Sequence, residues 1–234
     1  MENPVEMTKA QKRKAKKQSR DQRRATKPFL PLNDSQRFMF ESLESASQIF
    51  AIGEAGTGKT YISARHAARE LMAGRTQKII ICRPTIAPAA HTLGFLPGNL
   101  NTKLRPWLVP VIDAISDDMS STQINRLMQA GDIQFLSFEH MRGRSLHDCI
   151  VILDEAQNCT LHDLHMFLTR KGENTQYIIN GDPRQSDISN SGLHIVLSMV
   201  EKYDISADII EFDAADVVRS EDAKEWVRAF SKSS

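Results

Sequence analysis

The sequence contains no apolar run approaching the roughly 18–20 residues that a membrane-spanning helix needs. Its first residues are polar and basic and lack the apolar segment of a secretory signal. The three cysteines, Cys82, Cys149 and Cys159, have no Cys-x-x-Cys spacing and are odd in number. We therefore expect neither a membrane protein, a disulfide framework nor a zinc site, and we expect the protein to work in a reducing cytoplasm.

Apolar side chains are also scarce in residues 1–27, which carry ten basic and three acidic residues and hence a charge of +7. The remaining residues carry a charge of −6. Because a segment this polar cannot build a core, we expect a flexible, disordered arm over 1–27 and one domain over 28–234. The arm could grip nucleic-acid phosphates or serve only as a solvated tail. Pro28 and Pro31 mark the boundary.

The rest of the 234-residue chain has an ordinary globular composition, with 41% apolar and 25% charged residues. Short apolar segments alternate in it with longer amphipathic ones. Strands are predicted at 48–52, 78–82, 133–137, 149–153, 176–180 and 209–212. Helices are predicted at 59–73, 104–115, 121–129, 192–202 and 221–230, with a further helix start at 33–36. This alternation predicts an α/β fold, with a mostly parallel sheet between helices.

The first motif fits the pattern G-x-x-x-x-G-K-[ST] at every fixed position and lies between a predicted strand and a predicted helix. Its glycines let backbone N–H groups approach phosphate oxygens, and the helix N-terminus adds partial positive charge. Lys59 is expected to reach the β- and γ-phosphates, and Thr60 to place its hydroxyl on Mg²⁺. The predicted nucleotide-binding residues of this loop are Gly53, Glu54, Ala55, Gly56, Thr57, Gly58, Lys59 and Thr60.

A second motif, at 150–157, joins four apolar residues to the acidic pair Asp154 and Glu155. In a parallel sheet, the carboxyl ends of the strands carry the ligand site. Asp154 is therefore expected to hold Mg²⁺ through its water shell, and Glu155 to polarise the water that attacks the γ-phosphate. Adjacent carboxylates favour hydrolysis over phosphoryl transfer to a small molecule.

The third motif, at 177–185, is another apolar strand that ends in a Gly-Asp-Pro turn presenting Gln185. A glutamine can hydrogen-bond both the γ-phosphate and the attacking water without adding charge. Gln185 could therefore report whether that phosphate is present. A polar turn with no such role is the alternative.

These three motifs, in this order, resemble superfamily 1 helicases. The fuller set of motifs resembles the PhoH family of P-loop ATPases more closely, over roughly residues 32–230. The matching segments are 33–36, 53–60, 83–84, 93–98, 141–144, 151–157, 181–185 and 218–219. The basic arm lies outside this resemblance, and we do not expect the RNase-type domain that is fused to some relatives. The resemblance implies one RecA-like P-loop NTPase domain that uses ATP and Mg²⁺.

The resemblance also implies roles for other residues. Gln36 lies where superfamily 1 helicases place a glutamine that reads adenine, although a polar helix start is the alternative. Arg83 could contact phosphate or nucleic acid. Arg142 and Arg144 could serve nucleic acid or a neighbouring subunit, or lie in a solvated loop. Arg219 is the candidate arginine finger, with a surface arginine as the alternative, because the Ser-Glu that follows departs from the His-Pro-like family pattern.

An arginine must meet much of the transition-state charge on the γ-phosphate, an effect of about 10³–10⁵ in rate. Superfamily 1 helicases supply it from a second domain, for which this chain has no room. Arg219 is therefore expected to act on a neighbouring subunit of a homo-oligomeric ring, a hexamer as in similar family members. The sequence predicts ATP hydrolysis coupled to single-stranded RNA or DNA binding or to helicase-type translocation. A nucleotide-gated interaction protein and a P-loop small-molecule kinase remain alternatives.

Overall fold

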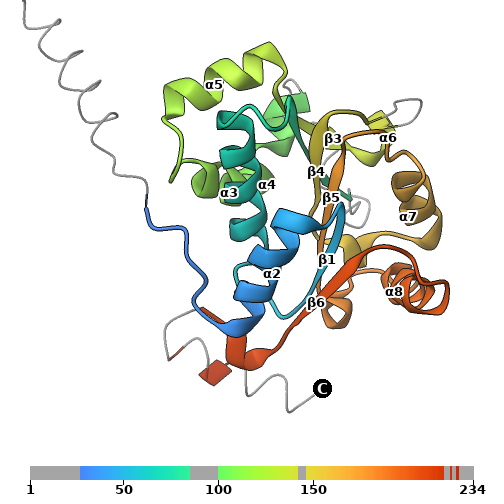
Figure 1. The fold of residues 1–234 in the computed structure, drawn as a ribbon. Coiled ribbons are helices and arrows are strands. Elements are labelled where there is room, and N and C mark those ends of the chain that lie inside the picture. Colours follow the sequence, from blue (N-terminus) through green and yellow to red (C-terminus); the bar gives the residue numbers. More distant parts are fainter. Residues whose placement is uncertain (1–26, 85–99, 142–145, 219–221, 223–224, 227–234) are drawn as a thin grey trace, which may run out of the picture.

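A single sheet runs through the middle of the molecule (Figure 1). The computed structural model describes residues 27–84, 100–141, 146–218, 222, 225 and 226. In this part of the chain, six strands pair in parallel in the order β3-β2-β4-β5-β1-β6. Their bounds are β1 Gln48–Gly53, β2 Lys78–Arg83, β3 Ile133–Ser137, β4 Cys149–Leu153, β5 Gln176–Gly181 and β6 Asp208–Phe212. The predicted α/β fold is confirmed.

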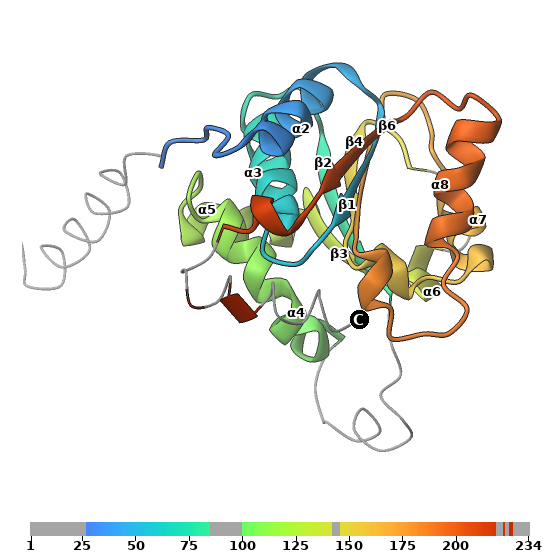
Figure 2. The same cartoon turned by 90° about the horizontal axis from the view of Figure 1, so that it is seen from below.

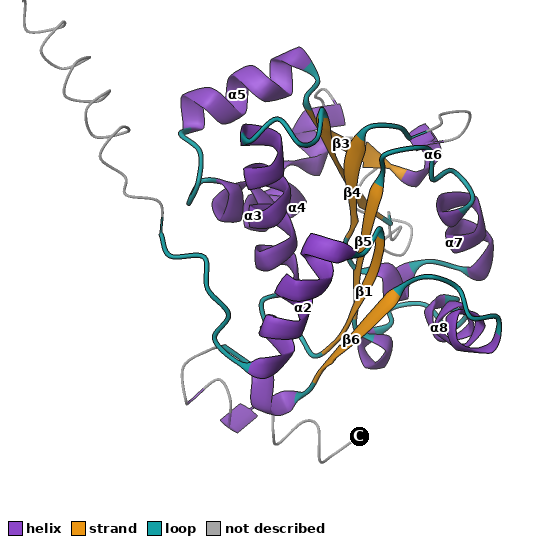
Figure 3. Cartoon of the chain, viewed as in Figure 1, coloured by secondary structure: helices purple, strands orange, loops and turns teal. Residues whose placement is uncertain are grey.

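Helices cover both faces of this sheet (Figures 2 and 3). One face carries α2 (Asp34–Ser45), α3 (Lys59–Met72), α4 (Leu100–Ile115) and α5 (Ser121–Ala130). The other carries α6 (Phe138–Met141), α7 (Leu161–Leu168) and α8 (Leu193–Lys202). Because the sheet is covered on both faces, the middle residues of its central strands are mostly apolar, and all five residues of β4 are buried.

Short local signals set the helix ends that the sequence predicts. The Asn33 side chain accepts a hydrogen bond from the Gln36 backbone N–H at 2.8 Å and so caps α2. After α3, Gly74 adopts a left-handed conformation with φ 70° and donates to the Leu71 carbonyl at 3.1 Å. A glycine is favoured there because it carries no Cβ to clash.

Two helices were not predicted, α6 and α7. They are short, with four and eight residues, so neither contains enough turns to show a clear apolar period. The start of α7 nevertheless has a recognisable signal, because Thr160 and Asp163 form a reciprocal capping box. The predicted helix at 221–230 lies largely outside the described residues.

The chain that leads out of the arm is held on α3 and on the turn that follows α4. Lys27 pairs with Asp117 at 2.8 Å, and the Lys27 carbonyl accepts a hydrogen bond from Arg65 at 2.7 Å. The Phe29 ring stacks on the Arg65 guanidinium at 4.8 Å. Residues 1–26 of the predicted arm lie outside the described residues. Within the described part of the chain, no helix is long and apolar enough to cross a membrane.

Candidate nucleotide-binding site

The carboxyl ends of four strands meet at one edge of the sheet. The strand register pairs Ile52 of β1 with Gly181 of β5, and Leu153 of β4 with Cys82 of β2. The phosphate-binding loop, the acidic pair, the Gly-Asp-Pro turn and Arg83 therefore all leave the sheet on the same side. This is the edge at which open parallel sheets bind their ligands.

In the loop from Gly53 to Thr60, both backbone conformation and close contacts favour glycine at Gly53 and Gly58. Gly53 has φ 134°, and a Cβ there would lie 1.8 Å from the Phe212 carbonyl oxygen of β6. Gly58 has φ 95°, and a Cβ there would lie 2.9 Å from Gln36 Nε2. Larger residues would break the contact with β6 or displace Gln36, so the loop shape depends on both glycines.

Lys59 lies inside this loop and is 9% exposed. Its Nζ donates to the carbonyls of Gly53 and Glu54, both at 2.6 Å, and to the Thr57 hydroxyl at 3.2 Å. Burial lowers the pKa of the Lys59 ammonium, and the nearby carboxylates, Asp182 first among them, oppose this effect. The Lys59 ammonium is thus enclosed by oxygen acceptors of its own loop.

Thr60 and Asp154 meet although 94 residues separate them in the chain, since the Thr60 hydroxyl donates to Asp154 Oδ1 at 2.7 Å. Burial raises the pKa of the Asp154 carboxyl, and the Thr60 hydrogen bond partly opposes the rise. Magnesium usually takes one or two protein oxygens and completes its shell with water and substrate phosphate. The two predicted metal ligands lie together, and their oxygens suit that ion.

Glu155 follows directly and has a left-handed backbone with φ 58°, which is uncommon for a residue with a side chain. One carboxylate oxygen faces Arg83, whose Nη2 lies 3.2 Å away. The other accepts a hydrogen bond from Gln157 Nε2 at 2.6 Å. Arg83 therefore contacts the predicted water-activating residue, and its predicted contact with phosphate or nucleic acid stays a prediction.

A small polar cavity of about 70 Å³ lies between these groups. Within the described residues, two buried atoms in its lining lack a hydrogen-bond partner: Asn180 Nδ2, a donor, and Asp182 Oδ2, an acceptor. Buried polar groups are rarely left unpaired, so these two atoms can hydrogen-bond a polar ligand or water in the cavity. Its lining residues are Ala55, Lys59, Asp154, Glu155, Gln157, Asn180, Gly181, Asp182 and Gln185.

Gln36 lies against the same loop and is buried. Its Nε2 donates to the Thr57 carbonyl at 2.8 Å, and its Oε1 accepts from the Leu32 backbone N–H at 2.9 Å. The amide thus supports the phosphate-binding loop from the α2 side. Its predicted contact with adenine stays a prediction.

The chain after β6 also reaches this loop. The Val218 backbone N–H donates to the Gly56 carbonyl at 2.9 Å, and Asn33 Nδ2 donates to the Asp216 carbonyl at 3.2 Å. The candidate arginine finger, Arg219, comes directly after Val218 but lies outside the described residues. Arg142 and Arg144 lie outside them as well.

Three residues that contribute to the site lie within the predicted motifs but had no predicted role. Gln157 joins Glu155 to the turn after β5. Asn180 is a polar residue that follows the apolar middle of β5, and that position was its available signal. Arg184 pairs with buried Glu54 of the phosphate-binding loop at 3.2 Å, a contact that no local pattern indicates.

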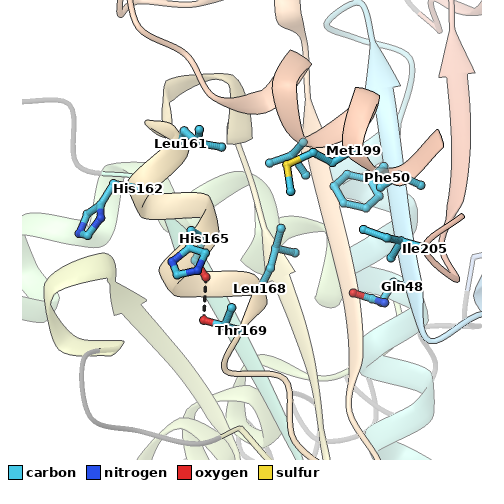
Figure 4. Close-up of a pocket in the computed structure, with 11 residues that line it drawn as sticks. Gln48, Phe50, Leu161, His162, His165, Leu168, Thr169, Met199 and Ile205 are labelled. Atoms are coloured by element: carbon cyan, nitrogen blue, oxygen red, sulfur yellow. Dashed lines mark hydrogen bonds between the residues drawn. The ribbon is translucent and has the colours of Figure 1, made fainter. Parts of the chain in front are cut away.

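A larger cavity, of about 670 Å³, lies between helices α7 and α8 (Figure 4). Helices α7 and α8 form its walls, with Phe50 of β1 between them. The lining is mostly apolar, and its titratable side chains are His162 and His165. Because it offers no cluster of cations or glycine-rich loop for phosphate, the small polar cavity is the candidate nucleotide site.

The parallel sheet, the glycine-dependent loop and the facing Thr60–Asp154 pair define a P-loop NTPase domain. A solved structure agrees with this fold: the large terminase from the thermophilic bacteriophage D6E matches 85% of this chain and 50% of its own, with a TM-score of 0.54 and 10% identity. Residues 29–231 match the family described as PhoH-like protein, and the chain belongs to that family.

Two curated relatives agree with the family assignment. The PhoH-like protein of Bacillus subtilis (strain 168) is 40% identical over 200 residues, which are 84% of this chain and 62% of the relative. The protein PhoH of Escherichia coli (strain K12) is 39% identical over 213 residues, or 89% of this chain and 60% of the relative. The chain therefore matches less than two thirds of the length of either relative.

Proposed function

We propose that this protein hydrolyses ATP to ADP and phosphate, and that single-stranded RNA or DNA stimulates the reaction. The observation that carries the proposal is the small polar cavity, because residues of all three motifs line it together. Lys59 comes from the first motif, Asp154 and Glu155 from the second, and Gln185 from the third.

Each of these residues has a chemical role in the proposal. Backbone N–H groups of the loop and Lys59 hold the phosphates, so the ammonium exchanges its present carbonyl partners for phosphate oxygens. Thr60 and Asp154 would hold Mg²⁺, which supplies charge neutralisation on the phosphates when bound. Glu155 accepts the proton of the attacking water, and Gln185 orients that water.

The nucleic-acid part of the proposal rests on the charge of the N-terminal segment. Residues 1–27 carry a charge of +7, and a basic segment that neutralises phosphates binds nucleic acid in a salt-dependent way. We further propose that the protein works in the cytoplasm as a hexameric ring, with Arg219 completing the site of the next subunit.

ATP turnover measured with and without single-stranded RNA or DNA, over a range of salt, tests the proposal. We expect stimulation that declines as salt rises, because binding through phosphates releases counterions. Turnover that ignores nucleic acid at every salt concentration would remove the nucleic-acid part and favour a small-molecule or partner-gated role.

Two substitutions test the chemistry. Lys59→Ala should abolish turnover. Glu155→Gln should lower it by about 10²–10⁴-fold while ATP binding persists, because the amide keeps the size of the side chain but cannot accept the proton of the attacking water. Lys78→Ala is the matched control, since Lys78 is exposed at the opposite end of strand β2. Normal turnover by Glu155→Gln would refute the assignment of the base.

A further inference from the structure

We propose that Gln157 is a positioning residue that holds the Glu155 carboxylate at a set distance from the turn after β5. This inference rests on the proposed ATP hydrolysis and assigns a role to a residue whose side chain, among the described residues, forms no hydrogen bond with the phosphate-binding loop or the predicted metal ligands. Gln157 lies in the short 3-10 helix η1 (Ala156–Asn158) and is 2% exposed.

Both ends of the Gln157 amide are used. Its Nε2 donates to Glu155 Oε2 at 2.6 Å and, over a longer 3.4 Å, to the Gln185 carbonyl. Its Oε1 accepts the Asp182 backbone N–H at 3.0 Å. One buried amide therefore connects the proposed base to both ends of the turn that presents Gln185.

This connection has a direct consequence for the site. Glu155 can act on a water that Gln185 orients only if the two side chains keep a set distance, and they come from different strands. The left-handed backbone of Glu155, with φ 58°, costs free energy and persists only because surrounding contacts hold it. The hydrogen bonds of the carboxylate are among these contacts. Gln157 is the partner that also contacts the turn.

The neighbouring residue provides a matched control. Asn158 is also buried, and its amide joins η1 to the same loop by a similar pair of hydrogen bonds with Asp187, at 3.1 and 2.8 Å. The bonds of the Asn158 side chain do not include Glu155 or Gln185. A variant at Asn158 therefore loosens the loop attachment without removing the proposed connection.

The experiment measures kcat, KM and ATP binding of the full chain with Gln157→Met, Gln157→Glu and Asn158→Leu. Gln157→Glu keeps an acceptor for the Asp182 N–H but removes the donor to Glu155. We expect both Gln157 variants to lower kcat about 10–100-fold, the usual cost of losing a group that orients a functional side chain, with ATP affinity nearly unchanged. In a Glu155→Gln background, Gln157→Met should change residual turnover no more than about twofold.

The outcomes separate this inference from the function it rests on. An equal loss of kcat in Asn158→Leu, or normal kcat in Gln157→Glu, would overturn the positioning role while leaving ATP hydrolysis intact. A wild-type chain that does not turn over ATP would overturn the proposed function and the inference with it. Thermal unfolding and ATP binding of each variant identify any loss that comes from misfolding.

Discussion

Two opposing effects act on the carboxylate of Asp154. Its carboxylate is placed to serve a cation beside Thr60, yet burial raises its pKa and so disfavours the charged form. A carboxyl whose folded pKa is raised binds more protons in the folded state than in the unfolded state, between the two pKa values. The free energy of unfolding therefore falls as pH rises through that range, and the full destabilisation is present above it.

We accordingly predict that Asp154→Asn raises the unfolding temperature of the metal-free protein at neutral pH, while ATP turnover is lost. Asparagine keeps the acceptor for the Thr60 hydroxyl and removes the buried charge. Thermal unfolding as a function of pH is the measurement, and the gain should vanish below the ordinary aspartate pKa, about 3.9. A variant less stable than wild type at pH 7 would contradict the electrostatic argument.

At the scale of single residues, the sequence predicted the loop and the acidic pair because both are local. Glycine at Gly53 and Gly58 is favoured by backbone conformation, which a short pattern records. The pairing of Arg184 with Glu54 joins residues 130 positions apart, and no spacing rule indicates it. Gln157 was visible within its motif, but its role depends on the partners that only the folded chain supplies.

Helix α3 is held at two points along its length. Its N-terminus belongs to the phosphate-binding loop, and further along it Arg65 is completely buried against Asp118 at 2.6 Å. Arg65 also donates to the carbonyls of Lys27 and Pro28, at 2.7 and 3.1 Å. The helix that begins at the nucleotide site therefore carries the chain that leads into the basic arm.

We predict that Arg65→Met lowers the free energy of unfolding by about 3–5 kcal/mol, because it leaves a buried carboxylate with less compensation. Urea unfolding is the measurement. Arg69→Met is the control, since Arg69 pairs with the same Asp118 at 3.0 Å but is 39% exposed, and should cost at most about 1 kcal/mol. Equal costs for the two variants would show that burial does not set the contribution of Arg65.

Among the elements, the strands were predicted closely and the short helices poorly. Four to six apolar residues bounded by polar ones identify a buried strand, as in β4. Helix α7 has only eight residues and was missed, although its Thr160–Asp163 capping box was readable in the sequence. Short helices depend on packing against the sheet more than on their own pattern.

At the scale of the whole molecule, the prediction concerns which subunit's site Arg219 completes. Val218, one residue earlier, contacts Gly56 of its own chain at 2.9 Å, so action within one subunit is an alternative to action on the next. We predict that Arg219→Ala subunits mixed with Lys59→Ala subunits regain ATP turnover, because each supplies what the other lacks.

The mixing experiment is paired with light scattering, which reports the size of the assembly. Each variant measured alone is the control and should remain inactive. A monomer that shows no rescue on mixing would contradict the ring and favour an arginine that acts within its own chain.

The sequence by itself determined the class of site, since the loop, the acidic pair and the glutamine-bearing turn each follow from a few neighbouring residues. Only the tertiary structure decided that β5 lies between β1 and β4, and hence that the turn carrying Gln185 stands between the loop and the acidic pair. The reason is that strand order is set by pairing between distant segments, which local patterns do not encode. The Gln157 connection follows from that order, because its hydrogen bonds cross from the end of β4 to the end of β5.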